Sequence, residues 1–152
     1  MINKKSAAFS SAHLIGAEKQ RGDARQGKAV TRPGINGSTT GDGMQRKAWI
    51  IGLKPEKIDE YKRLHAEVWP RVLEMIQICN IRNYAIFLRE PENLLFGVYE
   101  YHGDDFDADM ARMASDPVTQ DWWALTEPCQ APLASKADGE WWSPMEQVFY
   151  QA

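Results

Sequence analysis

Three stretches of this chain contain strand-forming residues that are apolar on both faces, where a half-exposed strand would alternate apolar and polar residues. They are residues 48–53, 84–88 and 94–99. Helices packed on one side of an antiparallel sheet would cover only one of these two apolar faces. The second face therefore needs another cover. We expect a partner subunit to provide it, with a ligand pocket as part of the same surface.

The order of the predicted elements narrows the fold further. The first helix is expected to have a kink near Trp69, because Pro70 removes one internal hydrogen bond. In chain order we predict a strand at 47–53, a helix at 55–79, strands at 83–89 and 94–101 joined by a turn at 90–93, helices at 105–114 and 116–126, an irregular loop at 128–144 and a strand at 145–150. This β-α-β-β-α-β order predicts an α+β, ferredoxin-like sandwich.

Composition divides the chain into two parts. Residues 1–43 contain seven basic and three acidic residues, are rich in Gly, Ser and Thr, and have almost no apolar periodicity. Such a segment buries too little apolar surface to offset the entropy lost on ordering. We therefore predict that residues 1–43 are a disordered N-terminal extension or a leader, and that residues 44–152 form the single folded domain.

Charge and motif content exclude several classes of function. The formal net charge is −3, which gives no reason to expect nucleic acid or an anionic membrane as a partner. No apolar run approaches the roughly 20 residues that a membrane-spanning helix needs. Cys79 and Cys129 are isolated from each other and from the histidines, so the sequence carries no metal motif and a reduced, cytoplasmic setting is expected.

Tyr61 and His65 are the first candidate site residues. They stand four residues apart on the apolar face of the predicted helix, so their side chains should lie together and point inward. A histidine in this position is either a buried structural residue or a catalytic acid/base. Its ordinary pKa near 6.5 would allow proton exchange at neutral pH.

Aromatic residues supply the other candidates. Trp122 and Trp123 are adjacent on a predicted helix, where neighbouring side chains diverge by about 100°. Either both pack in the core, or one packs there and the other lines a cleft. Tyr84 offers a phenol at the start of a predicted strand, and Trp141-Trp142 follow in the late loop. Such aromatic faces can stack on the apolar C–H face of a sugar or on a protein partner.

These residues belong to motifs that resemble one protein family. Residues 44–150 resemble the L-rhamnose mutarotase family, with the motifs in the same order and at similar spacing. The matching motifs are Arg46-Lys47-Ala48, Glu60-Tyr61 followed by His65 and Trp69-Pro70, Asn83-Tyr84-Ala85-Ile86, Asn93-Leu94-Leu95-Phe96, Trp122-Trp123 and Glu146-Gln147-Val148-Phe149-Tyr150.

The resemblance implies a homodimer of ferredoxin-like subunits whose sheets pack together as a dimeric α/β barrel, with no metal and no cofactor. It implies interconversion of the α and β anomers of a 6-deoxy sugar, a small-molecule partner, by acid/base-assisted ring opening and closure. It places the proton donor at His65. It places the sugar-contacting side chains at Tyr61, Tyr84, Trp122 and Trp123.

One loop departs from the family pattern. Rhamnose-acting members often carry Asn-Pro-Asp-Asn-Ser-Pro before the last strand, whereas only Ser143-Pro144 matches within residues 132–144. L-fucose, another 6-deoxy sugar, is therefore an alternative substrate to L-rhamnose. Dimeric ferredoxin-like barrels also include haem-degrading and cofactor-free oxygenases, which the fold alone does not separate from a mutarotase. A sugar-binding protein without enzymatic activity is a third alternative.

Overall fold

The structure, a computed structural model, describes residues 43–151. The disordered extension predicted at residues 1–43 lies outside the described residues, apart from Gly43. In chain order the elements are β1 (Gln45–Leu53), a 3-10 turn (Pro55–Lys57), α1 (Ile58–Ala66), α2 (Pro70–Ile78), β2 (Ile81–Arg89), β3 (Leu94–Tyr101), α3 (Phe106–Ser115), α4 (Pro117–Thr126), a second 3-10 turn (Glu127–Cys129), β4 (Gln130–Ala131) and β5 (Ser143–Met145).

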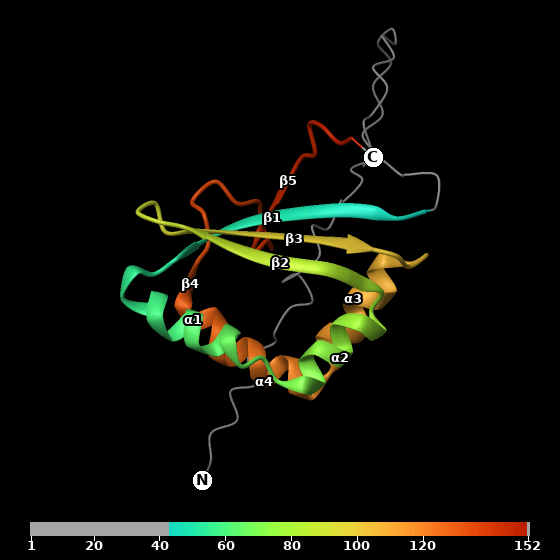
Figure 1. Cartoon of the computed structure of the whole chain (residues 1–152), viewed down its shortest axis with the longest axis horizontal. Coiled ribbons are helices and arrows are strands. Elements are labelled where there is room, and N and C mark those ends of the chain that lie inside the picture. Colours follow the sequence, from blue (N-terminus) through green and yellow to red (C-terminus); the bar gives the residue numbers. More distant parts are fainter. Residues whose placement is uncertain (1–42, 152) are drawn as a thin grey trace, which may run out of the picture.

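The strands form one antiparallel sheet in the order β2-β3-β1-β4, and β5 pairs with β1 as well. Helices α1 to α4 all lie on one side of this sheet (Figure 1). The predicted ferredoxin-like β-α-β-β-α-β arrangement is therefore confirmed. Of the helices between residues 43 and 151, none is both long and apolar enough to cross a membrane.

The strand register confirms that the sheet is apolar on both faces. On the helix side, Ile51 of β1 lies opposite Leu95 of β3, and both are buried. On the other side, Ile50 lies opposite Phe96, which in turn lies opposite Phe87 of β2. Phe87 is 61% exposed. In the single chain, part of this outer sheet face is thus apolar and open to solvent.

The helix predicted at residues 55–79 with a kink is instead two helices, so that prediction is wrong in detail. The residue before a proline is restricted to extended backbone, and Trp69 has φ −60° and ψ 134°. Pro70 then occupies the first turn of α2, where its missing N–H costs no helical hydrogen bond. The chain therefore ends α1 at Ala66 and restarts at Pro70, which turns the two helices relative to each other.

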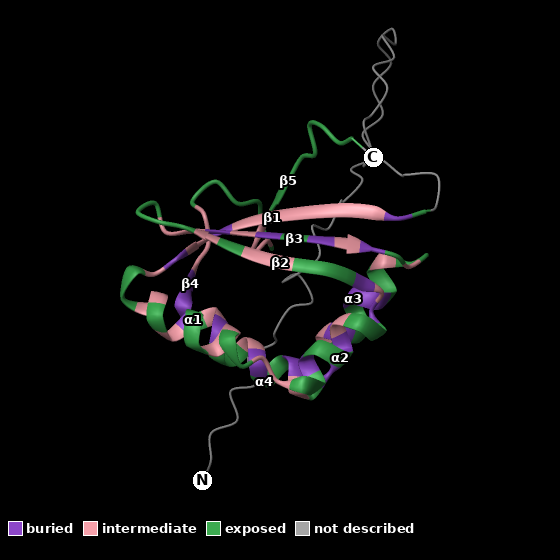
Figure 2. Ribbon diagram, in the orientation of Figure 1, coloured by how far each residue is buried: buried purple, intermediate pink, exposed green. Residues whose placement is uncertain are grey.

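The C-terminal end also differs from the prediction. The last strand is Ser143–Met145, not residues 145–150, and its register pairs Ala48 with Met145 and Ile50 with Ser143. The residues after β5 are exposed (Figure 2). Among them Phe149 is 78% exposed. Apolar residues at the end of the chain thus resemble a strand in sequence but pair with no strand among the described residues.

Candidate active site

A pocket of about 570 Å³ lies between the helix side of the sheet and helices α1, α2 and α4. This volume falls in the usual range for small-molecule sites. We expected the ligand pocket on the opposite sheet face, and that prediction is wrong. The strand residues Tyr84, Ile86 and Tyr99 that line the pocket belong to the face covered by helices. The predicted site residues Tyr61, His65, Tyr84, Trp122 and Trp123 all line this pocket.

Tyr61 and His65 form a stacked pair, as their spacing on α1 predicts. Their ring centroids are 4.1 Å apart with an interplanar angle of 27°. Nδ1 of His65 lies 3.0 Å from the backbone oxygen of Tyr61. A carbonyl oxygen can only accept, so Nδ1 carries the proton and donates it to this oxygen. In the neutral imidazole, Nε2 is then the unprotonated nitrogen.

Burial controls the charge of both rings. Burial of the half-buried imidazole lowers the pKa of His65 below its ordinary value of 6.5, and the hydrogen bond to the Tyr61 carbonyl only partly opposes this effect. Burial likewise raises the pKa of Tyr61. At neutral pH the site therefore contains a neutral imidazole, able to accept a proton at Nε2, beside a protonated phenol that can donate a hydrogen bond.

The two tryptophans come from α4, whose start is well defined. Asp116 caps the helix by accepting hydrogen bonds from the backbone N–H and the hydroxyl of Thr119, both at 2.9 Å. Trp122 is buried and packs edge-on against His65 at 5.5 Å between centroids. Trp123 is half-buried and packs against a buried cluster that includes Tyr99 of β3 and Met113 of α3. Both also reach the pocket, so the alternatives of core and cleft do not exclude each other here.

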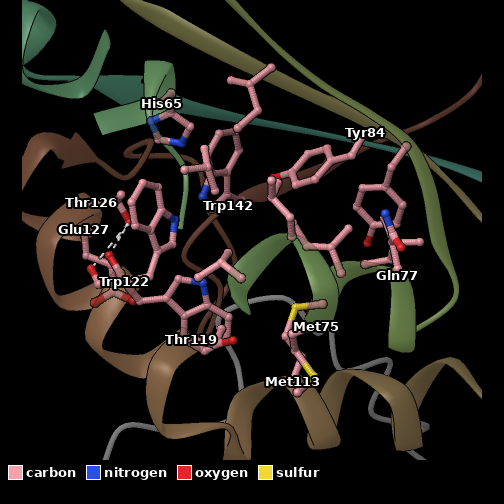
Figure 3. Close-up of a pocket in the computed structure, with 18 of the residues that line it drawn as sticks. His65, Met75, Gln77, Tyr84, Met113, Thr119, Trp122, Thr126, Glu127 and Trp142 are labelled. Atoms are coloured by element: carbon pink, nitrogen blue, oxygen red, sulfur yellow. Dashed lines mark hydrogen bonds between the residues drawn. The ribbon is translucent and has the colours of Figure 1, made fainter. Parts of the chain in front are cut away.

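Tyr84 lies two residues before Ile86 on the helix side of β2, next to a bulge in that strand. The pairing of β2 with β3 shifts by one residue between Arg82 and Ala85. Asn83 has a positive φ of 51° within this bulge. Tyr84 shares the side of β2 with Ile86 and points into the pocket between the sheet and the helices (Figure 3). The side chain is 40% exposed, but its phenol end lies within the pocket wall, where burial raises its pKa to about 12.

Some pocket residues were not predicted from the sequence. Tyr99 of β3 is buried, lines the pocket and packs edge-on against Tyr84, with 5.4 Å between centroids. Its hydroxyl has no hydrogen-bond partner among the described residues. Gln130 is likewise buried in the pocket wall. Neither residue carries a local sequence signal, because each is brought to the site only by sheet pairing.

Fold and pocket together define a class of protein: a small α+β, ferredoxin-like protein with a pocket lined by one imidazole and several aromatic rings. Comparison of the sequence with known families shows which family of that class the chain belongs to. The sequence model described as L-rhamnose mutarotase matches residues 46–151. The chain therefore belongs to the L-rhamnose mutarotase family.

Individual relatives agree with this assignment. The chain is 32% identical over 117 residues to an L-rhamnose mutarotase of Mesorhizobium japonicum, covering 71% of this chain and 98% of that protein. It is 34% identical over 85 residues to an L-rhamnose mutarotase of Oceanobacillus iheyensis, covering 56% of this chain and 79% of that protein. The crystal structure of an L-rhamnose mutarotase from Formosa agariphila superposes with a TM-score of 0.56 at 23% identity, covering 71% and 99% of the two chains, and supports the fold.

Proposed function

We propose that this protein is a mutarotase that interconverts the α and β anomers of L-rhamnose, with His65 as the proton carrier. The observation that carries the proposal is the placement of His65, a half-buried neutral imidazole, in an aromatic-lined pocket of a chain that belongs to this family. Tyr61, Tyr84, Trp122 and Trp123 are the proposed sugar contacts.

The chemistry requires one proton to move between two oxygens bonded to the same carbon. Ring opening removes the proton from the anomeric hydroxyl and adds a proton to the ring oxygen as the bond from C1 to that oxygen breaks. Nε2 of His65 can take the first proton and return it to the ring oxygen, so one nitrogen acts as base and then as acid. The carbonyl group of the open sugar then turns, and the reverse transfers close the ring to the other anomer.

The surrounding groups have distinct proposed roles. The hydrogen bond from Nδ1 to the Tyr61 carbonyl fixes the tautomer and the ring orientation of His65. The Tyr61 and Tyr84 phenols remain protonated because burial raises the pKa of each. They can therefore donate hydrogen bonds to sugar hydroxyls throughout the reaction. The indole rings of Trp122 and Trp123 would hold the apolar C–H face of the sugar while its C1 end turns.

We further propose that the active protein is a homodimer joined through the outer sheet face. That face carries Ile50 and Phe96 in register with the 61%-exposed Phe87, and no helix within residues 43–151 covers it (Figure 1). Two copies packed sheet against sheet would bury these side chains. Hydrophobic burial of this kind is the main favourable term in protein association.

Exchange NMR between the α and β anomeric protons tests the proposed activity. We expect wild-type protein at neutral pH to accelerate exchange of L-rhamnose over the uncatalysed rate, and to accelerate L-fucose less. Greater acceleration of L-fucose would assign the other 6-deoxy sugar as substrate. If neither sugar exchanges faster with protein present, the mutarotase proposal fails.

A further inference from the structure

Trp142 lies in the pocket although it comes from the loop that departs from the family pattern. In the view of Figure 3 its indole lies between the labelled His65 and Tyr84. Its position is confirmed at the sheet: a Cβ placed on Gly97 would lie 3.6 Å from Cζ3 of Trp142 and 3.7 Å from Cε2 of Tyr84. The two rings therefore meet over the same glycine, and Trp142 is half-buried there.

Two attachments hold Trp142 in place, one on each side in the sequence. Before it, the indole Nε1–H of Trp141 donates a 2.6 Å hydrogen bond to Oε1 of Gln130, a buried residue of β4. After it, Ser143 begins β5 and pairs with Ile50 of β1. A residue in an otherwise irregular loop is thus fixed against the sheet, as a binding residue needs to be.

We propose that Trp142 is a substrate-binding residue that forms an additional aromatic wall of the pocket, and that Trp141 positions it. The inference rests on the proposed function, because the ligand is the same 6-deoxy sugar. Trp142 comes from the loop before β5, whereas Trp122 and Trp123 come from α4. The sugar would therefore contact indole rings from two separate segments of the chain. Trp142 packs against the buried cluster that includes Ile51 and Leu95, and it also lines the cavity beside His65, so its ring has one side available to a ligand.

The role of Trp142 is binding and not proton transfer, since an indole has no titratable group near neutral pH. Loss of its ring should therefore weaken sugar affinity and leave the chemical step nearly intact. Loss of the aromatic contact and of its buried area should raise KM about tenfold in Trp142→Ala, which corresponds to about 1.4 kcal/mol of binding free energy. Trp142→Phe keeps a smaller ring and should show an intermediate KM.

The test measures anomer exchange of L-rhamnose against sugar concentration for wild type, Trp142→Ala and Trp142→Phe. We expect KM to rise about tenfold in Trp142→Ala with kcat changed by about twofold or less. Leu125→Ala is the matched control, because Leu125 is 43% exposed on α4 and does not line the pocket. Circular dichroism checks that both Trp142 variants are folded. If both have the spectrum of wild type and an unchanged KM, the proposal is overturned.

A double-mutant cycle tests the positioning role of Trp141. Trp141→Phe keeps an aromatic ring, a smaller one, and removes the indole N–H that donates to Oε1 of Gln130. If Trp141 acts through Trp142, the rise in KM from Trp141→Phe should largely disappear in the Trp142→Ala background. Full additivity would contradict positioning and leave Trp141 with an independent effect.

Calorimetric titration with L-rhamnose separates this inference from the proposed function. Wild type that binds the sugar without accelerating exchange would refute the mutarotase activity. Weaker binding by Trp142→Ala would then still support Trp142 as a contact, and equal binding would refute it. If wild type binds neither L-rhamnose nor L-fucose, both the proposed function and the role of Trp142 are refuted.

Discussion

His65 stacks on Tyr61 and also donates its Nδ1 proton to the backbone oxygen of that same residue, at 4.1 Å between ring centroids and 3.0 Å between the bonded atoms. One helical turn of α1 thus fixes the position, the orientation and the tautomer of the imidazole. The nitrogen left to react is Nε2. Because burial lowers the pKa of His65, this nitrogen is unprotonated at neutral pH and available to accept a proton.

The pH dependence of catalysis follows from that lowered pKa. The active form of free enzyme has neutral His65, so kcat/KM should rise with pH through an inflection below 6.5 and be level near neutrality. The raised pKa values of Tyr61 and Tyr84 keep both phenols neutral across this range. Anomer-exchange rates measured from acidic to neutral pH give the profile. An inflection above 6.5 would contradict the assignment.

The same shift predicts a pH effect on stability. In the range between the lowered pKa of the folded state and the ordinary pKa of 6.5, the unfolded chain binds a proton at His65 that the folded chain does not. His65 should therefore reduce the free energy of unfolding as pH falls below 6.5. Urea denaturation of wild type and His65→Gln at several pH values measures this. Equal pH dependence in both proteins would argue against a lowered pKa.

The unpaired hydroxyl of Tyr99 should weaken the fold of the sugar-free protein. A buried polar group without a hydrogen bond costs about 1–3 kcal/mol, and the Tyr99 hydroxyl has no partner among the described residues. Tyr99→Phe removes that hydroxyl and keeps the ring that packs against Trp49. We expect the free energy of unfolding to increase by about 1 kcal/mol. A decrease in urea titration would show that the hydroxyl has a partner.

The Asp116 cap should stabilise α4, the helix that carries Trp122 and Trp123. Burial of Asp116 opposes its ionisation, but the hydrogen bonds from Thr119 and the neighbouring charge of Arg71 together outweigh burial and hold the pKa of this carboxyl below 3.8. Its contribution to stability is therefore present above pH 3.8 and lost as pH falls through the lowered pKa. Asp116→Ala should cost about 1–2 kcal/mol of unfolding free energy, and Asp116→Asn, which can still cap, much less. Equal losses in thermal or urea denaturation would argue against capping.

The proposed dimer predicts a specific sensitivity to charge on the outer sheet face. Phe87→Asp would place a carboxylate in an apolar interface, where an unpaired charge is strongly unfavourable. We expect light scattering after gel filtration to give a dimer for wild type and a monomer for Phe87→Asp. Leu125→Asp is the control and should stay dimeric, because the Leu125 side chain is exposed on α4, which lies on the other side of the sheet. A monomeric wild type would refute the dimer.

Local patterns made a large part of the fold predictable. The four-residue spacing of Tyr61 and His65 placed both on one face of a helix, and the structure brings them together with Trp122 in one pocket. The element order likewise predicted the sheet. These features depend on periodicity within a single element, which the sequence records directly.

The remaining features depend on contacts between distant segments. Trp142 is in the pocket because Trp141 bonds to Gln130 and because β5 pairs with β1, and no local pattern in the loop encodes either contact. The side of the sheet that carries the pocket was predicted incorrectly for a related reason. Both faces are apolar, so residue type alone did not distinguish the face that packs against helices from the face left open.

The most direct test of the account compares wild type with His65→Gln in exchange NMR of the L-rhamnose anomeric protons. Glutamine can hydrogen-bond to sugar but cannot carry a proton, and general acid–base catalysis commonly contributes about 10²–10⁴-fold. We predict that wild type accelerates exchange, and that folded, sugar-binding His65→Gln loses at least about 100-fold of that acceleration. A His65→Gln protein that exchanges the anomers at the wild-type rate would contradict the central claim.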